Sequence, residues 1–127
     1  MISIEDRMAI LDLCAEYNYA IDTGASAKWA DTFTEDGLFE GGVGTARGRA
    51  ALIAFSDKFH TDYPGCMHMT DNHLFEPDGA VMKHKCFLSF QVPREGGTQI
   101  VLVGYQDELV RVAGAWRFRS RRVGPLA

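Results

Sequence analysis

The sequence has few cysteines, no excess of positive charge and no long apolar run, and each absence argues against a class of protein. Its three cysteines are scattered along 127 residues, and an odd number does not suit a disulfide framework. A formal net charge of −4 argues against a general nucleic-acid binder, which needs a basic face. No apolar run reaches the roughly 18 residues of a membrane span, and the first residues lack the pattern of a signal peptide. We therefore expect a cytoplasmic protein with no membrane or nucleic-acid partner.

The periodicity of the apolar residues predicts one α+β domain over residues 1–127. Spacings of three and four predict helices at about 4–22, 26–33 and 47–60. A short strand is expected at 38–41, before a glycine-rich loop. After residue 65 the period changes to two, which predicts strands at about 66–76, 80–92, 98–112 and 115–123. Helices that precede an antiparallel meander predict a curled, mainly antiparallel sheet packed on three N-terminal helices, a cone-shaped barrel with a cavity for a small molecule.

Strand alternation predicts which side chains of the first two long strands face that cavity. His68 should share a face with Cys66, Thr70, Asn72 and Leu74. His73, five residues further along, should lie on the opposite face. In the next strand two lysines mark the solvent side, so the inward residues should be Met82, His84, Cys86, Leu88 and Phe90.

The last strand contains the basic run RFRSRR. If Trp116 and Phe118 face inward, Ser120 and Arg122 follow them, and Arg117, Arg119 and Arg121 are left outside. Arginines on the solvent face of a sheet indicate a charged edge or an oligomer contact rather than a nucleic-acid motif. Arg122 continues an apolar series and is a functional candidate.

The sequence predicts no metal site and no cofactor. It contains no CxxC, HxH or HExxH motif. His68 and His73 should point to opposite faces of their strand, so they could not converge on one ion.

Asp22 and His68 form a candidate catalytic pair. Asp22 follows apolar Ile21 at the end of the first helix. If this helix lies across the mouth of the sheet, its carboxylate could bond one imidazole nitrogen and make the other a competent base. Spacing alone favours a plainer interpretation, in which Asp22 bonds local backbone and His68 is a satisfied core histidine.

Several segments together resemble the SnoaL-like proteins of the nuclear transport factor 2 superfamily, over nearly the whole chain. They are EDRMAILDLCAEYNYAIDTG, WADTFTEDGLFEG, GRAALIAF, HMTDNHLFE, GYQDELVRV and WRFRSRRV. The pattern is most similar to the branch with scytalone dehydratase, hexachlorocyclohexane dehydrochlorinase and bile acid 7α-dehydratase. The resemblance implies the cone-shaped barrel, a homodimer or homotrimer, and an Asp–His dyad that works without cofactor or metal. In this sequence the dyad falls on Asp22 and His68.

The resemblance also implies further site residues. A tyrosine five residues before the aspartate falls on Tyr17, which could share a site with Asp22 only if the helix ends or bends nearby, because residues five apart lie about 140° apart. A late catalytic arginine falls on Arg122, with Arg121 not excluded. Tyr105 and His84 are expected as substrate-binding residues, and further candidates to line the pocket are Asn72, Phe90, Phe39 and Trp116.

We therefore predict a cofactor-independent lyase, most simply a dehydratase, acting on a mostly apolar molecule with a carbonyl or hydroxyl group. Ketosteroid isomerase chemistry is disfavoured, because Gly41 occupies the position of that enzyme's base and Glu40 has the opposite parity. The alternative is a non-catalytic binding or oligomerisation module of the same fold. A third possibility is a small subunit that supports a larger enzyme.

Overall fold

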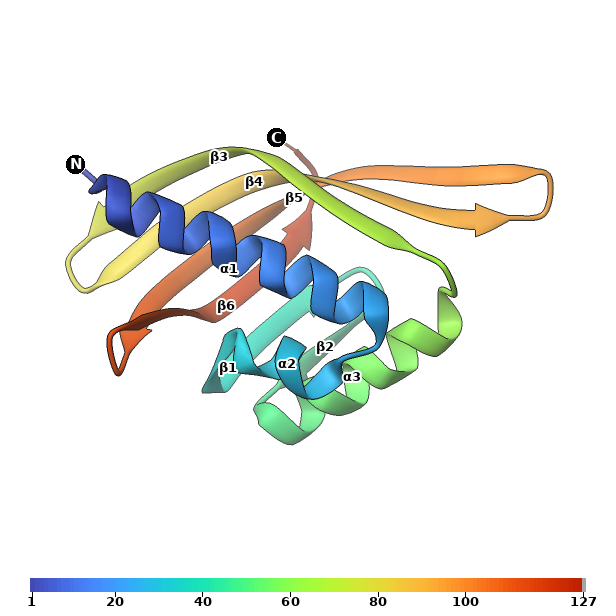
Figure 1. Cartoon of the computed structure of the whole chain (residues 1–127), viewed down its shortest axis with the longest axis horizontal. Coiled ribbons are helices and arrows are strands. Elements are labelled where there is room, and N and C mark those ends of the chain that lie inside the picture. The colour runs from blue at the N-terminus through green and yellow to red at the C-terminus, as the bar shows by residue number, and fades with distance from the viewer. Residues whose placement is uncertain (127) are drawn as a thin grey trace.

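A computed structural model describes residues 1–126 and shows three helices packed on one face of a six-stranded sheet (Figure 1). The helices are α1 (Ile4–Thr23), α2 (Ser26–Asp31) and α3 (Arg49–Asp62). The strands are β1 (Phe33–Gly41), β2 (Gly44–Arg47), β3 (Met67–Asp78), β4 (Val81–Arg94), β5 (Gly97–Val112) and β6 (Ala115–Gly124).

The strands follow the order β2-β1-β6-β5-β4-β3. The pair β1–β6 is parallel and every other neighbouring pair is antiparallel. The sheet is therefore mixed and mainly antiparallel, and it does not close, because β2 and β3 remain as edges. Figure 1 shows α1 lying across the curled sheet, and the β4–β5 hairpin extending beyond the body as a two-stranded arm.

Helix α1 has clear start and stop signals. The side chain of Ser3 accepts a hydrogen bond of 3.0 Å from the backbone N–H of Asp6 and caps the first turn. Gly24 ends the helix in the left-handed conformation with φ 75°. The apolar stripe predicted from the spacing is confirmed, and its buried members include Ile10, Leu13, Cys14, Tyr17 and Ile21.

The core between helices and sheet is strongly aromatic. Trp29 of α2 is completely buried, and its ring centroid lies 5.1 Å from that of Phe33 and 5.7 Å from those of Phe39 and Phe55. Such tilted and stacked pairs add to the burial energy of each ring. These rings fill the part of the interior near α2 and α3.

Two elements differ from the predicted ones. The second helix ends at Asp31, and Phe33 already belongs to β1, which is longer than the strand predicted at 38–41 and has an irregularity between Phe33 and Leu38. The glycine-rich loop is shorter than expected, because Gly44–Arg47 pairs with β1 as strand β2. A four-residue edge strand bounded by glycine has too few alternating residues to show in the sequence.

Among the described residues, no helix has both the length and the apolar character required to span a membrane.

Candidate active site

The end of α1 and the start of β3 bring an aspartate and a histidine into contact. Asp22 is the second-last residue of α1, and His68 is the second residue of β3. His68 Nδ1 lies 2.6 Å from Asp22 Oδ1, and the backbone N–H of His68 donates to Asp22 Oδ2 over 2.7 Å. The carboxylate thus holds this histidine twice, through its ring and through its backbone.

This contact fixes the tautomer of His68. A carboxylate can only accept, so Nδ1 carries the hydrogen and Nε2 keeps its lone pair. Within residues 1–126 no hydrogen bond is made to Nε2. The ring centroids of Phe90 and Phe59 lie 4.9 and 5.6 Å from that of His68, which is only 8% exposed. A proton-accepting nitrogen therefore faces apolar surroundings.

Cys66 supplies a third hydrogen bond to the same carboxylate. Its thiol donates to Asp22 Oδ1 over 3.5 Å. Burial, followed by the negative charge of Asp22, raises the pKa of Cys66 to about 12. The thiol therefore stays protonated at neutral pH and acts as a donor.

The abrupt end of α1 is what frees Asp22 to reach β3. A carboxylate near a helix C-terminus is electrostatically unfavourable, and the last turn of α1 contains no basic residue. The donors of His68 and Cys66 offset that cost. The turn that follows requires glycine at position 24, because its φ is 75° and a Cβ there would lie 2.9 Å from the ring of His60.

A bulge in β3 reverses the predicted alternation beyond residue 71. The β3–β4 register shifts between Asp71 and Leu74, and Asn72 takes the left-handed conformation with φ 56°. The inward positions predicted for Asn72 and Leu74 are therefore wrong, because both are exposed. His73 instead turns inward, so it lies on the same inner face as His68, contrary to the sequence-based expectation.

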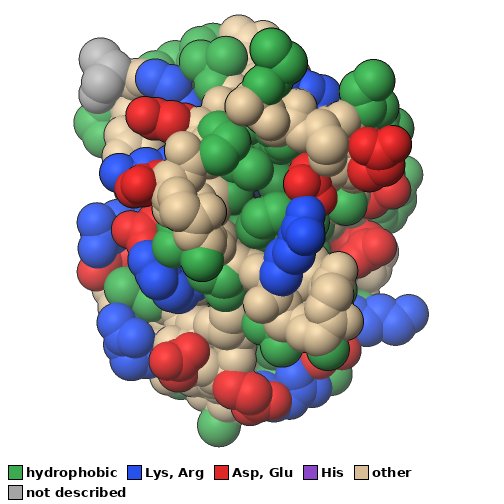
Figure 2. All heavy atoms as spheres, turned by 90° about the vertical axis from the view of Figure 1, so that its left-hand side faces the viewer, with side chains coloured by type: hydrophobic (Ala, Val, Ile, Leu, Met, Phe, Trp, Pro, Cys, Tyr) green, Lys and Arg blue, Asp and Glu red, His purple; other side chains and the backbone are tan. Residues whose placement is uncertain are grey.

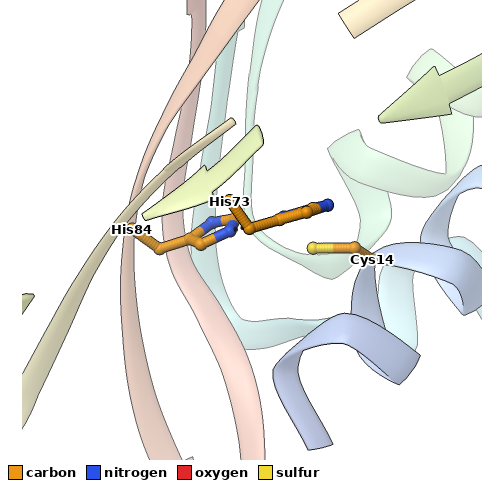
Figure 3. Close-up of side chains that lie close together, drawn as sticks. All are labelled: Cys14, His73 and His84. Atoms are coloured by element: carbon orange, nitrogen blue, oxygen red, sulfur yellow. Dashed lines mark hydrogen bonds between the residues drawn. The ribbon is translucent and has the colours of Figure 1, made fainter. Parts of the chain in front are cut away.

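His73 joins a buried polar cluster formed by β4, β5 and β6, and Figure 3 shows it beside His84 of β4. His73 Nδ1 lies 2.9 Å from His84 Nε2, and His84 Nδ1 lies 2.7 Å from Asp107 Oδ2. His84 points inward, as the alternation of β4 predicted, and its side chain and that of Asp107 are fully buried. Cys14 of α1 approaches the two imidazoles from the helix side.

Arg121 provides the counter-charge for Asp107. Its Nε donates to Asp107 Oδ1 over 2.9 Å and a terminal nitrogen donates to Oδ2 over 3.1 Å. The guanidinium carbon lies 3.6 Å from the ring centroid of Tyr105, 4.3 Å from that of Phe118 and 4.5 Å from that of Tyr17. Arg121 is completely buried, and its second terminal nitrogen has no hydrogen-bond partner among residues 1–126.

The predicted inward position of Arg122 is wrong for a local reason. In the β5–β6 ladder Leu109 pairs with Phe118 and Glu108 pairs with Ser120, which leaves Arg119 as an extra residue. This bulge moves Arg121 inside and Arg122 outside. The side chain of Arg122 is 63% exposed and lies 3.3 Å from Glu40. Arg121 is therefore the arginine of this strand that faces the interior.

Tyr17 and Tyr105 lie beside Arg121. The Tyr105 hydroxyl donates to the Tyr17 hydroxyl over 3.4 Å, and both side chains are buried. Burial raises the pKa of Tyr17 to about 12 and that of Tyr105 well above its ordinary value. Both phenols are therefore protonated donors at neutral pH. Tyr17 packs with the Arg121 group, one helical turn or more from Asp22.

The remaining predicted site residues occupy different surroundings. Phe90 packs directly on His68, whereas Phe39 is a buried core residue against Trp29. Trp116 is partly exposed, and its indole N–H donates to Asp6 Oδ1 over 3.0 Å. Of these, Phe90 alone touches the Asp22–His68 pair.

In the part of the chain that the structure describes, two groups of side chains bring metal-ligand atoms together, Cys14 with His73 and His84, and Asp22 with Cys66 and His68. The imidazole geometry of the first group does not match a bound ion. Two nitrogens on one tetrahedral zinc ion, each at about 2.0–2.1 Å, would be about 3.3 Å apart and would both point at the ion. His73 and His84 instead have centroids 5.2 Å apart and planes only 19° apart. Two nitrogens that face each other in line place the ring centroids 2.9 Å plus about one ring width apart, which matches the observed centroid distance. The two nitrogens therefore point at each other and not at a common ion.

Figure 2 views the end of the molecule where α1 begins and the β3–β4 and β5–β6 turns lie. It shows a hollow near the centre of this face with apolar walls and with acidic and basic side chains at its rim. A hollow of this composition suits a mostly apolar molecule with a few polar groups.

Comparisons with known proteins agree with this architecture. A family model described as a SnoaL-like domain matches residues 3–122. Rv3472 from Mycobacterium tuberculosis, a protein of unknown function, is 34% identical over 93% of this chain and 70% of its own, with a TM-score of 0.86. No curated protein matches the sequence significantly.

Two structures from Novosphingobium aromaticivorans are also similar. An NTF2-like protein with a cystatin-like fold is 26% identical over 97% of this chain and 83% of its own, with a TM-score of 0.87. A proposed scytalone dehydratase is 22% identical over 94% of this chain and 83% of its own, with a TM-score of 0.83. The latter likeness shows the fold alone.

Proposed function

The chain belongs to the SnoaL-like family, and from that premise we propose that it is a cofactor-independent lyase, most simply a dehydratase. Its substrate would be a mostly apolar small molecule that bears a carbonyl and a hydroxyl group. The observation that carries the proposal is the doubly held carboxylate of Asp22, which leaves Nε2 of His68 as an unbonded lone pair.

In this proposal His68 is the general base. Its Nε2 removes a proton from a carbon next to the substrate carbonyl, and Asp22 stabilises the imidazolium that forms. The electron pair left on the carbon forms the new double bond as the C–O bond breaks, and the departing hydroxide takes the proton from the imidazolium and leaves as water. Proton transfer by a positioned side chain contributes ~10²–10⁴-fold to such a step.

The donors for a developing negative charge would be the phenols and Arg121. Tyr17 and Tyr105 are protonated at neutral pH, and Arg121 has one terminal nitrogen without a partner in the described chain. Buried donors of this kind stabilise an oxyanion more strongly than water does. Arg121 thus takes the role that the sequence assigned to Arg122.

The spacing of these groups suggests a substrate of two or more fused rings. Phe90, which pairs with His68, and Cys86, which pairs with Tyr105, are four residues apart on β4. Four residues of strand span about 13 Å. A substrate that contacts both His68 and Tyr105 must have a comparable length.

The test is an elimination assay with fused-ring β-hydroxy ketones, followed by the ultraviolet absorbance of the conjugated product. We expect turnover in the wild type, a loss of about 10²-fold or more in His68→Gln, and a smaller loss in Asp22→Asn. His60→Gln is the matched control, because His60 is exposed and lies outside both polar groups. Equal rates in wild type and His68→Gln would rule out His68 as the base.

The second candidate is a non-catalytic binding module. It is favoured by the dense aromatic packing around Trp29, which fills part of the interior. In that case the His68→Gln variant would change ligand affinity or stability, and no member of the substrate set would lose water.

We also propose that the chain forms a homodimer or homotrimer through the outer face of β3, β4 and β5. That face carries exposed apolar side chains on each of the three strands, with Ser89 and Gln91 of β4 lying between those of β3 and β5; they are Met67, Met69, Phe87, Ile100 and Leu102. Contiguous exposed apolar residues mark interaction surfaces. Sedimentation analysis of wild type and Leu102→Lys would test it, with dissociation expected in the variant and unchanged mass counting against this face.

A further inference from the structure

We propose that Asp107, His84 and His73 form a second acid–base site, in which Nε2 of His73 accepts a proton from a phenolic or similarly acidic hydroxyl group of a bound ligand. This site is separate from Asp22 and His68 and does not depend on the lyase activity proposed above.

With both imidazoles neutral, the hydrogen bonds leave one consistent set of tautomers. Asp107 accepts from Arg121 on both oxygens, so the nitrogen of His84 that faces Oδ2 must carry a hydrogen. Nε2 of neutral His84 is then an acceptor, and Nδ1 of His73 must be the donor across the 2.9 Å contact. Nε2 of His73 keeps its lone pair, at the far end of a series of hydrogen bonds that begins at the carboxylate of Asp107.

The ring geometry fits proton transfer along this chain. The two imidazole planes differ by only 19°, and their facing nitrogens lie nearly on the line between the ring centroids. An in-line N–H···N bond of this kind lets a proton move between rings with little motion of either side chain.

The proton movement balances as follows. A ligand hydroxyl gives its proton to Nε2 of His73 and becomes an oxyanion. The hydrogen on Nδ1 of His73 moves to Nε2 of His84, which becomes an imidazolium. Its positive charge then lies beside the carboxylate of Asp107, 2.7 Å away. The reverse movements return the proton to the ligand.

The local backbone is strained to bring His73 into this chain. Asn72 has φ 56°, a left-handed conformation that costs most residues other than glycine about 1–3 kcal/mol and that asparagine tolerates better than they do. Without this bulge the side chain of His73 would point to solvent. Strain of this kind is concentrated at functional sites, because the surrounding structure must hold it in place.

The imidazoles of the second site lie well away from His68, although Arg121, which donates to Asp107, is also a proposed donor of the lyase site. His84 and Phe90, which packs on His68, are six residues apart on β4, a strand distance of about 20 Å. Between the two groups the side-chain amide of Asn18 donates to the Thr70 hydroxyl over 3.2 Å. No hydrogen bond in the described chain connects His68 with His73.

An acidic hydroxyl group is the ligand chemistry that matches Nε2 of His73. Burial, followed by the neighbouring His84, lowers the pKa of His73, so the imidazole is neutral at neutral pH and accepts a hydrogen bond. The ring of Phe75 is stacked on it, at 6.4 Å between centroids and 20° between planes. A flat aromatic ring that carries a hydroxyl group combines the required donor with a stacking face.

The first test reads the tautomers by nitrogen-15 NMR of the four imidazoles. We expect Nδ1–H on both His73 and His84, and a scalar coupling across the hydrogen bond between His73 Nδ1 and His84 Nε2. Hydrogen on Nε2 of His73 in the resting protein, or absence of the coupling, would overturn the assignment. Zn²⁺ added to the sample should leave the coupling unchanged, whereas its loss with zinc binding would mean a metal site instead.

The second test measures binding of para-nitrophenol, whose absorbance changes when it loses its proton. We expect His73→Gln to weaken binding about tenfold, the worth of one hydrogen bond in an apolar site, and to reduce the ionised fraction of the bound probe. The exposed control His60→Gln should bind it as the wild type does. Failure of the wild type to bind, or equal binding by His73→Gln, would overturn the proposal, whatever the lyase assay shows.

Asp107→Asn is a variant that keeps the size and shape of the side chain that anchors the hydrogen-bonded series of Asp107, His84 and His73. An amide nitrogen facing His84 Nδ1 would reverse both tautomers and place hydrogen on Nε2 of His73, as an aspartate-to-asparagine change does in other carboxylate–histidine pairs. We expect it to abolish the uptake of the probe's proton. If this variant does not fold, His73→Gln decides the matter alone, since His73 is half-buried at the edge strand.

Discussion

Replacing Arg121 with methionine should be far more destabilising than the same change at Arg122. Arg121 is fully buried and makes two hydrogen bonds to Asp107, at 2.9 and 3.1 Å. Its removal leaves the carboxylate of Asp107 buried without a counter-charge, which costs about 3–5 kcal/mol. The 3.6 Å contact with the ring of Tyr105 is lost as well.

Arg122 is a matched control in the next position of the same strand. Its side chain is 63% exposed and lies 3.3 Å from Glu40. Exposed ion pairs contribute about 0–1 kcal/mol, so Arg122→Met should change the free energy of unfolding by no more than that. A protein of this size has about 5–15 kcal/mol of stability, so both variants should remain measurable.

The assay is urea unfolding at neutral pH, followed by tryptophan fluorescence. The double variant Arg121→Met with Asp107→Asn should be more stable than the two single losses added together, because a neutral pair replaces a broken ion pair. Equal losses at positions 121 and 122 would refute the assigned positions of the two arginines. Additive losses in the double variant would refute the coupling between Arg121 and Asp107.

Three further changes test the elements that shape the site. Burial and His84 lower the pKa of His73 from its ordinary 6.5, so the folded protein binds this proton less readily than the unfolded chain does. The contribution of His73 to the free energy of unfolding should therefore be constant above pH 6.5 and fall as the pH drops below it, and His73→Gln should reduce that fall in urea titrations at several pH values. Gly24→Ala should destabilise by about 1–2 kcal/mol or more in thermal unfolding, because φ is 75° there, whereas Gly42→Ala meets no atom within 4 Å and should be nearly neutral. Asn72→Val should cost about 1–2 kcal/mol and Asn72→Gly little or nothing, and equal losses in both would show that residue 72 is not left-handed in solution.

Much of the fold could be predicted because its elements are long and regularly patterned. Helix α1 combines a capping residue, an apolar stripe and a terminal glycine, and its predicted span of 4–22 differs from the observed Ile4–Thr23 by one residue. The inward face of β4 is also confirmed, because exposed Lys83 and Lys85 alternate with buried residues at positions 82, 84 and 86. Position on a regular strand follows from parity alone.

Parity fails where a strand contains an extra residue. A single bulge at Asn72 in β3 and another at Arg119 in β6 reverse which side chains face inward in the second half of each strand. Parity therefore predicted the wrong face for His73 and Arg121. Asn72 was a detectable signal, since asparagine is rare in strands and tolerates the left-handed conformation. The inward position of Asp107 could also have been predicted, because Asp107 shares the parity of Tyr105 and Leu109.

The contact between Asp22 and His68 depends on three-dimensional placement that spacing does not give. The two residues are 46 positions apart, and they meet because α1 ends where β3 begins. Only the order of the strands and the turn at Gly24 bring those two ends together.

The most direct test of His68 as a general base is the elimination of a nitrobenzisoxazole probe, which releases a coloured phenolate when one carbon-bound proton is removed. The measurement compares the wild type with His68→Gln, Asp22→Asn and the control His60→Gln across neutral pH. We expect the wild type and the control to be equal, His68→Gln to be ~10²–10⁴-fold slower, and Asp22→Asn to lie between them. The same rate in wild type and His68→Gln would contradict the assignment of His68 as the base.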